Sequence, residues 1–362
     1  PEYAYIGNIE TEYDHGEHQD DILIFIEKKV NNEDISRFPA LKGIIIYNQE
    51  VEANIKINGP PSLRYIGFDY VRFTPPTGPE SMTLFPIPRD TESPYEVFVN
   101  ECEKIPLDAL LTATNYPGAG ITVIDSGLVL EAEADGSTHS DLEITGWQGK
   151  DLHIQYLGVD APFPPKVMVS ACPYLEYLLL ESIGTRDGNL GEPDNFPLDM
   201  TKIFLEISNL DFLSTLHTNH KLVVCDLMPK LTFIKIEKGA EKNKATIVGL
   251  ENCPGLDNLW WVDDFQPEMF SEVCQLANLK SLHVSGSRIT NLNGCEFLVN
   301  LKRLSLGSSA LVKDLTKCVR SGSLSDEALL QALWQIDFDK TLVESTSPEL
   351  HKVLSRICKG RR

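Results

Sequence analysis

The sequence contains no apolar run long enough to cross a bilayer. Its longest aliphatic stretches are GIIIY at 43–47 and YLLLE at 177–181, whereas a membrane-spanning helix needs about 20 consecutive apolar residues. The first residues also lack the basic segment followed by an apolar stretch that marks a secretory signal. We therefore expect a folded cytoplasmic protein with no membrane partner; secretion after removal of a signal upstream of Pro1 is the alternative.

Positive charge is scarce as well. The chain has 32 Lys and Arg against 53 Asp and Glu, which gives a formal net charge of -21 at pH 7. Such a charge repels the phosphates of nucleic acids and of anionic membranes, and it attracts basic proteins. The composition therefore excludes nucleic acid as the expected partner and favours a basic protein. The alternative is that the charge only keeps the protein soluble.

Paired cysteines are absent, because the 8 cysteines occur singly and no CxxC motif is present. This spacing does not indicate a zinc site or a disulfide framework. Asn-x-Ser/Thr glycosylation sites are also absent. Single cysteines at intervals of 21 to 28 residues suit small buried positions that recur in a repeat, and they are Cys225, Cys253, Cys274, Cys295 and Cys318.

A repeated pattern of aliphatic residues is present instead. The residues Leu279, Leu282, Val284 and Ile289 recur 22 positions later as Leu301, Leu304, Leu306 and Leu311. Self-similarity at such a period indicates a repeat architecture. The template Leu-x-x-Leu-x-Leu, with other apolar residues allowed at each fixed position, also fits five earlier segments, which begin at Leu41, Leu63, Leu175, Leu231 and Leu256.

Proline precedes most of these segments by a fixed distance. In five of the seven, it lies two residues before the first leucine, at Pro39, Pro61, Pro173, Pro229 and Pro254. Proline there ends the preceding segment and favours an extended chain leading into a strand. The combination of spacing and proline resembles the leucine-rich repeat family in an irregular form. The resemblance implies an α/β solenoid, curved, with a parallel sheet on its concave face and return segments on its convex side.

The repeats are not uniform. Between residues 73 and 140 no segment fits the template well, although AGITVIDSGLVL at 119–130 and SDLEITG at 140–146 read as strands of further repeats. The family usually places an asparagine three residues after the last leucine, where its side chain binds the turn backbone. Here Ser287 and Ser309 occupy that position, so we expect weaker hydrogen bonding at the turns.

We expect three segments along the chain. Residues 1–33 form a leader and N-terminal cap, residues 34–318 form the leucine-rich-repeat solenoid, and residues 319–362 form a C-terminal helical cap. Inserted loops are expected at 75–91 and 186–195, which are rich in proline, glycine and acidic residues.

The caps are expected because the two open ends of a solenoid need polar covers. Ser325 can cap a helix with acidic residues in its first turn, and Ser347 can cap a second helix that has Pro348 at its first position. At the other end, the apolar stretch 20–30 is expected to be the strand that opens the stack.

One segment resembles a catalytic motif. The stretch 335–345, QIDFDKTLVES, is similar to the first motif of haloacid-dehalogenase-type phosphatases. In that family the residues matching Asp337, Asp339 and Thr341 support phosphoryl transfer with Mg²⁺. The motif belongs at the end of a buried strand, however, and here a helical pattern precedes it. We therefore expect no enzyme; a phosphatase centred on Asp337 is the remote alternative.

Candidate metal ligands are equally weak. His15 and His18 lie among acidic residues in 13–21, but a polar leader at a chain end is more often solvated. His217 and His220 are spaced i,i+3 without an identifiable third ligand. We expect neither a metal nor a cofactor.

The template itself predicts a binding face. Strand alternation turns the template aliphatics inward and the x residues beside them onto the concave face. Aromatic and acidic side chains recur there, as they do in protein-binding hot spots; alternatively, loops or the leader cover them. The predicted partner-binding residues are Tyr47, Tyr65, Asp69, Tyr177, Glu181, Phe233, Glu237, Trp260, Asp264, His283 and Arg303.

These observations predict a non-enzymatic protein that binds a basic protein partner on its concave face. Some acidic leucine-rich-repeat proteins embrace and neutralise a basic nuclease, so an inhibitor or toxin-immunity role is the sharper form of this hypothesis, by fold-level analogy. The alternative is a targeting or adaptor module, or an effector, that supplies specificity to a catalytic partner.

Overall fold

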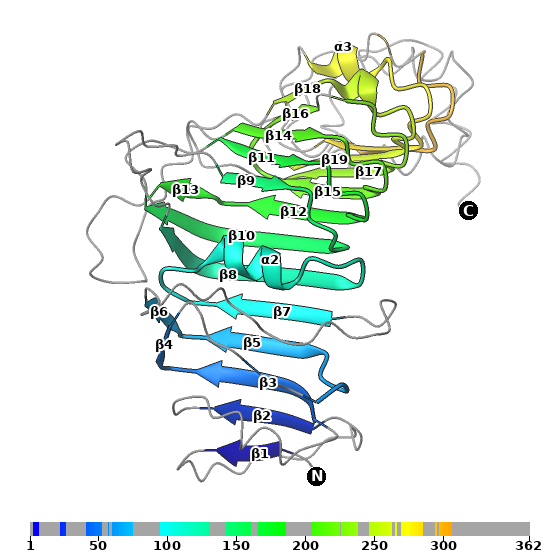
Figure 1. The fold of residues 1–362 in the computed structure, drawn as a ribbon. Coiled ribbons are helices and arrows are strands. Elements are labelled where there is room, and N and C mark those ends of the chain that lie inside the picture. The colour runs from blue at the N-terminus through cyan, green and yellow to red at the C-terminus, as the bar shows by residue number, and fades with distance from the viewer. Residues whose placement is uncertain are drawn as a thin grey trace, which may run out of the picture. The chain divides into compact units, whose positions relative to one another are not determined.

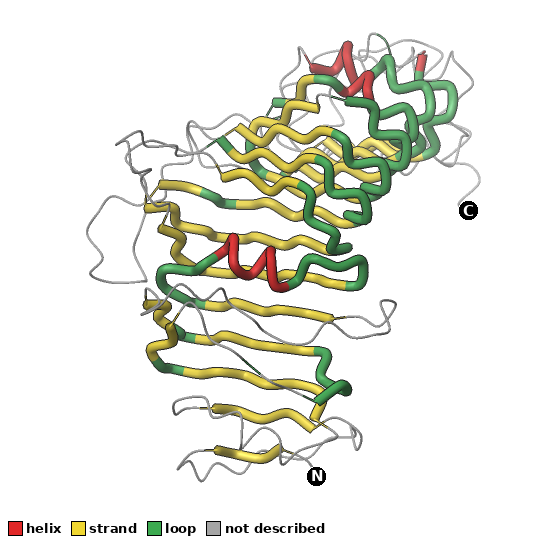
Figure 2. The backbone as a smooth tube through the Cα atoms, in the orientation of Figure 1, coloured by secondary structure: helices red, strands yellow, loops and turns green. Residues whose placement is uncertain are grey.

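The computed structural model divides into two compact units, Pro1–Ile203 and Phe204–Arg362, a division that falls inside the 34–318 segment. Both units consist of long parallel sheets with few helices, which makes the chain an α/β protein (Figures 1 and 2). The residues that the structure describes are 3–6, 22–26, 41–52, 57, 60–74, 95–129, 142–160, 166–185, 204–224, 226–237, 246–262, 265, 269–284, 294 and 297–305.

The larger sheet of the first unit is built in chain order. Each of its strands pairs in parallel with the next one along the sheet. After each strand the chain must therefore cross back to the end of the sheet at which all strands begin. The strands are β1 (Tyr3–Ile6), β2 (Ile22–Ile26), β3 (Leu41–Tyr47), β5 (Tyr65–Asp69), β7 (Tyr95–Asn100), β8 (Ala119–Val129), β10 (Asp151–Asp160) and β12 (Tyr177–Glu181).

Within the stretch 20–30, Ile22–Ile26 form a strand, as expected, but it is not the first one. Strand β1 precedes β2 and pairs with it in parallel, so the sheet begins within the segment assigned to the leader. The C-terminal segment 319–362 and the loops expected at 75–91 and 186–195 lie outside the described residues.

Smaller sheets form a second layer that the sequence did not predict. In the first unit, β9 (Leu142–Thr145) pairs with β11 (Val167–Ser170), and β4 (Glu50–Glu52) pairs with β6 (Arg72–Thr74). Strand β13 (Gly184–Thr185) instead pairs with β10 in the larger sheet. The strand expected within 140–146 is thus β9, but it belongs to this second layer. A short helix, α2 (Leu107–Ala113), occupies another return segment.

The second unit repeats the two-layer plan. Its larger sheet has the order β15 (Thr215–Thr218), β17 (Phe233–Ile236), β19 (Asn258–Trp261), β20 (Ser281–Val284) and β21 (Arg303–Ser305). Its smaller sheet has the order β14 (Phe204–Ser208), β16 (Lys221–Val224) and β18 (Ile247–Val248). In the following return segment the strand is replaced by the short helix α3 (Phe270–Val273).

The template aliphatics form the core, as predicted. Leu279, Leu282, Val284 and Leu301 are at most 1% exposed, and alternate residues of the smaller sheets are buried as well. Because each strand buries one face, the core of each unit lies between its two layers. The side chains of Leu304 and Leu306, which the same register predicts to be buried, lie outside the described residues.

The turns of the first unit share one backbone conformation. The residue after the third row of this sheet is left-handed without being glycine in β3, β5, β7, β8 and β12: Asn48, Tyr70, Glu101, Asp125 and Ser182 have φ between 47° and 54°. The amide of one such residue donates to the carbonyl of the next turn, as from Asn48 to Asp69 at 3.0 Å and from Tyr70 to Asn100 at 3.1 Å. The strands β3, β5, β7 and β12 end at this bend, whereas β8 continues through it to Val129 and stays paired with β10.

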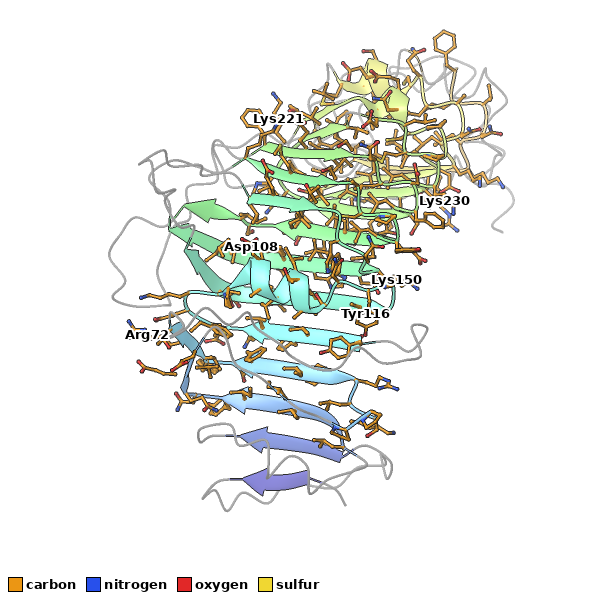
Figure 3. The ribbon with its side chains drawn as sticks, in the orientation of Figure 1. Arg72, Asp108, Tyr116, Lys150, Lys221 and Lys230 are labelled. Carbon is orange, nitrogen blue, oxygen red and sulfur yellow. The ribbon has the colours of Figure 1, made fainter. Side chains whose placement is uncertain are left out.

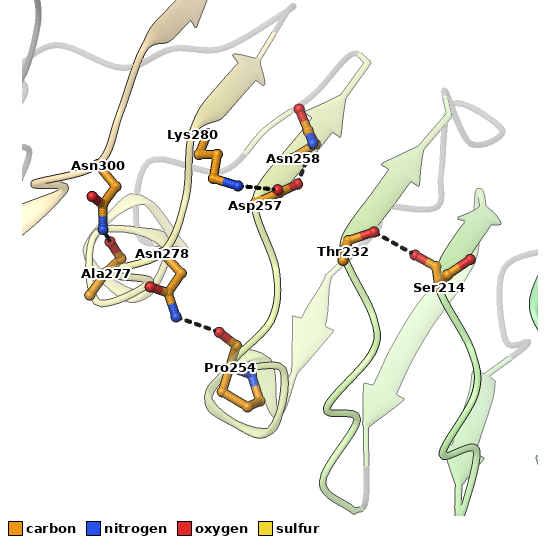
Figure 4. Close-up of polar contacts among 9 residues, drawn as sticks. All are labelled: Ser214, Thr232, Pro254, Asp257, Asn258, Ala277, Asn278, Lys280 and Asn300. Carbon is orange, nitrogen blue, oxygen red and sulfur yellow. Dashed lines mark hydrogen bonds and ion pairs between the residues drawn. The ribbon is translucent and has the colours of Figure 1, made fainter.

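Asparagine does contact the turn backbone, but from another position than the one the family uses. The amide nitrogens Nδ2 of Asn278 and Asn300 donate to the carbonyl oxygens of Pro254 and Ala277 in the preceding turn, at 2.7 and 2.9 Å (Figure 4). Each asparagine directly precedes a template leucine. Asn278 and Asn300 therefore bind the turns that precede their strands; Ser287 and Ser309, where we expect weaker bonding, lie outside the described residues.

Candidate functional site

The candidate site of the first unit is the outer face of its larger sheet, meaning the face that points away from the core. The strand register aligns its residues into three rows across six strands. The first row is Gly43, Tyr65, Glu96, Gly120, Asp151 and Tyr177; the second is Ile45, Gly67, Phe98, Thr122, His153 and Leu179; the third is Tyr47, Asp69, Asn100, Ile124, Gln155 and Glu181.

These three rows contain acidic and aromatic residues and no lysine or arginine. The nearest cations lie at the N-terminal ends of the strands and are engaged there. Lys150, which Figure 3 labels, forms an ion pair with Glu176 at 3.3 Å, and Arg64 donates to the carbonyl oxygens of Pro61 and Leu63. The outer face of this unit is therefore anionic.

Tyr65 lies along its own strand, over a glycine. A Cβ added to Gly67 would lie 3.4 Å from the hydroxyl oxygen of Tyr65 and 3.1 Å from Cγ1 of Ile45, so the missing side chain makes room for the ring. Burial, together with the negative charges of Glu96 and Asp69, raises the pKa of Tyr65 to about 12. The hydroxyl therefore stays protonated at neutral pH and can donate a hydrogen bond.

A hydrogen-bonded group closes the third row at the C-terminal ends of β3, β5 and β7. Asn100 donates from Nδ2 to Asp69 at 2.8 Å, and the hydroxyl of Tyr70 donates to Glu101 at 2.8 Å. The ring of Tyr70 also contacts the ring of Tyr47 edge-on, with centroids 5.7 Å apart. These contacts fix the positions of two carboxylates, Asp69 and Glu101, and of two tyrosines, Tyr47 and Tyr70. The sequence had predicted only Tyr47 and Asp69 as partner-binding residues.

Two carboxylates of the first row flank a glycine that the sequence had not singled out. A Cβ on Gly120 would lie 3.7 Å from Cβ of Asp151 and 3.8 Å from Cγ of Glu96. Burial is the main factor that raises the pKa of Asp151. Burial also lowers the pKa of His153, and the charges of Asp151 and Glu96 partly offset this effect. All three groups therefore interact electrostatically around the space above Gly120.

Sequence reasoning missed Glu96 because β7 lacks the leucine template. The alternation in YEVFVN, residues 95–100, was the signal that could have found it, since the structure buries every second residue there. The same register places Asp151 and His153 on β10, a strand that the template also missed.

The remaining predicted residues of this unit lie on β12. Tyr177 packs against His153, with ring centroids 4.6 Å apart. Glu181 is only 8% exposed and accepts a hydrogen bond from Nε2 of Gln155 at 3.3 Å. Glu181, predicted to bind the partner, is therefore mostly buried, and its carboxylate is bound by its neighbour on β10.

The outer face of the second unit carries a row of four aromatic rings. His217 contacts Phe233, Phe233 contacts Trp260, and Trp260 contacts His283, with centroid separations of 5.4, 5.8 and 5.7 Å. The four residues come from the successive strands β15, β17, β19 and β20. Trp260 is 43% exposed. Three of the four had been predicted; His217 had been considered only as a metal ligand.

Charges on this second face are paired. Lys235 and Glu237 form an ion pair within one strand segment, so the field of Glu237 is largely compensated. Burial lowers the pKa of His283, which leaves its imidazole neutral at pH 7. Arg303 is exposed at the start of β21. Asp264 lies outside the described residues.

The cysteines offer no reactive thiol in the described part of the chain. Its four free cysteines are all buried, and burial raises the pKa of Cys102 and Cys253 to about 12, which makes these thiols inert as nucleophiles. Among the residues searched, no cluster of three or more His, Cys, Asp and Glu side chains could hold a metal ion. The motif around Asp337 and the stretch 13–21 lie outside the described residues.

None of the described helices is long and apolar enough to span a membrane. The two candidate surfaces are sheet faces, one anionic and rich in tyrosine, the other carrying an aromatic row beside the ion pair of Lys235 and Glu237. No family model matches this chain, and no curated protein sequence matches it significantly.

Proposed function

We propose that this chain is an irregular leucine-rich repeat protein, a curved solenoid with a C-terminal helical cap over residues 319–362, and that it binds a protein partner without catalysing a reaction. The in-register parallel strands support the repeat assignment, since equivalent residues 22 positions apart are Cα partners, such as Gly43 with Tyr65 and Ser281 with Arg303. A cytoplasmic inhibitor of a basic protein is the form of this function that the net charge of -21 favours.

The aromatic row of His217, Phe233, Trp260 and His283 carries the proposal. Trp and other aromatic residues dominate the energetics of protein interfaces, because they bury a large area at a low cost in side-chain entropy. Here the indole of Trp260 is held between two ring neighbours and is still 43% exposed. A bound partner would bury the rest of the Trp260 indole without changing the position of the ring.

The test compares Trp260→Ala with a matched control in the same unit. Phe204 lies on β14 of the smaller sheet and is 42% exposed, so Phe204→Ala removes an equally exposed ring from a different face. Immobilised wild-type and variant proteins are used to capture partners from a native lysate, and bound proteins are identified and then purified for affinity measurement.

The expected result is one protein ligand that wild type and Phe204→Ala bind equally and that Trp260→Ala binds at least about 30-fold more weakly, as the loss of a hot-spot side chain of about 2 kcal/mol implies. Equal binding by wild type, Trp260→Ala and Phe204→Ala would show that the aromatic row is not part of the binding site. Equal loss in both variants would show a general effect of lost aromatic surface.

The proposal that the protein is not an enzyme has its own test. Asp337→Asn should leave both the stability and any measured activity of the protein nearly unchanged. Purified protein is assayed with a generic phosphate monoester and Mg²⁺. Hydrolysis by wild type that Asp337→Asn abolishes would establish the phosphatase alternative.

A further inference from the structure

We propose that the outer face of the first unit binds an extended, arginine- or lysine-bearing segment of the partner protein, with one cationic side chain placed over Gly120 between Glu96 and Asp151. This inference rests on the proposed function and deepens it, because it names the chemistry of the partner. It concerns a different unit from the aromatic row, so the two can fail separately.

The space above Gly120 is the width of a side chain. Both flanking carboxylate side chains lie within 4 Å of the point where a Cβ would be, at 3.7 Å for Asp151 and 3.8 Å for Glu96. Neither carboxylate makes a side-chain hydrogen bond or ion pair with another residue that the structure describes. An ammonium or guanidinium group placed there could donate charge-assisted hydrogen bonds to carboxylates on two sides, and such bonds are the strongest kind available at a protein surface.

Within the same row, an aromatic residue flanks the two carboxylates on each side. Tyr65 is one strand beyond Glu96, and Tyr177 is one strand beyond Asp151. The aliphatic stems of lysine and arginine pack on such rings while the charged heads reach the carboxylates. With neighbouring strands about 4.8 Å apart, the row from Tyr65 to Tyr177 spans roughly 19 Å, which matches about six residues of an extended chain.

Charge complementarity selects a cationic polypeptide as the occupant. All charged groups in the three rows are acidic: Asp69, Glu96, Asp151 and Glu181. His153 faces the same space, and its lowered pKa keeps it neutral at pH 7, so it does not oppose a cation. The cation Lys150, which directly precedes Asp151 at the N-terminal end of β10, is paired with Glu176. A nucleic acid would be repelled by this face, and no set of three metal-binding side chains occurs in the described residues.

The probe is a fluorescent peptide of about 12 residues that alternates arginine and serine, long enough to cover the row; a citrulline version of the same length controls for size without charge. Binding to the full chain is followed by fluorescence anisotropy at low and high salt. One variant fills the space, Gly120→Leu, and another neutralises both carboxylates, the double substitution Glu96→Gln and Asp151→Asn. Gly120 does not have a left-handed backbone conformation, so the larger side chain is compatible with its strand.

Two control variants match these changes elsewhere. Thr145→Leu adds a leucine side chain to an exposed strand position of β9, outside the outer face of the larger sheet. Glu143→Gln removes an exposed carboxylate from β9 of the smaller sheet. Thermal unfolding monitored by circular dichroism confirms that each variant is folded before its binding is measured.

The expected result is that wild type binds the arginine peptide and not the citrulline peptide. Gly120→Leu and the double variant should each bind at least about tenfold more weakly, as expected for losing one charge-assisted hydrogen bond or more. The two controls should stay within about twofold of wild type. Equal weakening by Glu143→Gln would reduce the effect to net charge and overturn the inference.

Other occupants give other outcomes. Spermidine that binds as tightly as the peptide, with the same dependence on Gly120, would assign the space to small polyamines. Concentration-dependent self-association that the double variant abolishes would assign it to a second copy of the chain. Absence of peptide binding by wild type, combined with a protein ligand that still depends on Trp260, would overturn this inference and leave the proposed function standing. Peptide binding that depends on Gly120, combined with a protein ligand that does not depend on Trp260, would overturn only the role of the aromatic row.

Discussion

At the scale of single residues, burial decides which titratable groups respond to pH. His220 is 1% exposed, and burial lowers its pKa to about 4. His153 and His283 are half-buried and their pKa values are lowered in the same direction. Each imidazole therefore stays neutral in the folded protein at pH values at which it would be protonated in the unfolded chain.

The buried imidazole of His220 predicts acid-sensitive stability. Between the unfolded pKa of about 6.5 and the folded pKa, the unfolded state binds one more proton, so the stability that is fully present above pH 6.5 is lost as the pH falls toward 4. The contribution of this one group amounts to about 3 kcal/mol over the window. Urea unfolding at several pH values should show a shallower pH dependence for His220→Gln than for wild type. Parallel curves would contradict the assignment.

Binding kinetics should separate aromatic from acidic residues. Trp260→Ala should raise the dissociation rate of the partner at any ionic strength, because it removes dry contact area. Glu96→Lys should instead slow association, chiefly at low salt, since long-range attraction is screened by ions.

Glu237, predicted from the sequence to bind the partner, forms an ion pair with Lys235 in the second unit. Glu237→Lys and Glu96→Lys change the local charge by the same two units. Because the cationic segment is proposed to dock on the first unit, Glu237→Lys should slow association less than Glu96→Lys does. Stopped-flow measurements at two salt concentrations distinguish the two variants, and a larger effect at Glu237 would show that the partner approaches through the second unit.

At the scale of elements, each turn of chain is held by its buried leucines and by the bonds between successive turns. Leu282→Ala should reduce the free energy of unfolding by roughly 2–5 kcal/mol, as core truncations do. Asn278→Ala should cost only about 1 kcal/mol, because it removes one exposed hydrogen bond to Pro254. Denaturant titrations of both variants measure these values. A larger loss for Asn278→Ala would mean that the turn bonds, and not the core, dominate the stability of the second unit.

At the scale of the whole chain, the net charge of -21 opposes the compact state. Added salt screens this repulsion over about 10 Å at 0.1 M and less at higher concentration. The Tm should therefore rise by a few degrees between about 0.01 M and 0.5 M NaCl. A matched series in sucrose controls for general solute effects. A fall in Tm with salt would show that attractive ion pairs outweigh the repulsion.

Local pattern was sufficient to predict part of the molecule. The burial of Leu279, Leu282, Val284 and Leu301, and an exposed Trp260, follow from strand alternation within single segments of the sequence. These properties are determined by the sequence because solvent exclusion acts on each strand with the same two-residue period wherever that strand lies.

Only the tertiary structure decided which residues of different turns come together. Glu96, Gly120 and Asp151 are 24 and 31 residues apart along the chain, and unequal return segments hid their common row from a search with a fixed 22-residue offset. The second layer of strands escaped the same search. The reason is that backbone hydrogen bonds between strands, and not sequence spacing, fix the register, so turns of different length can align the same positions.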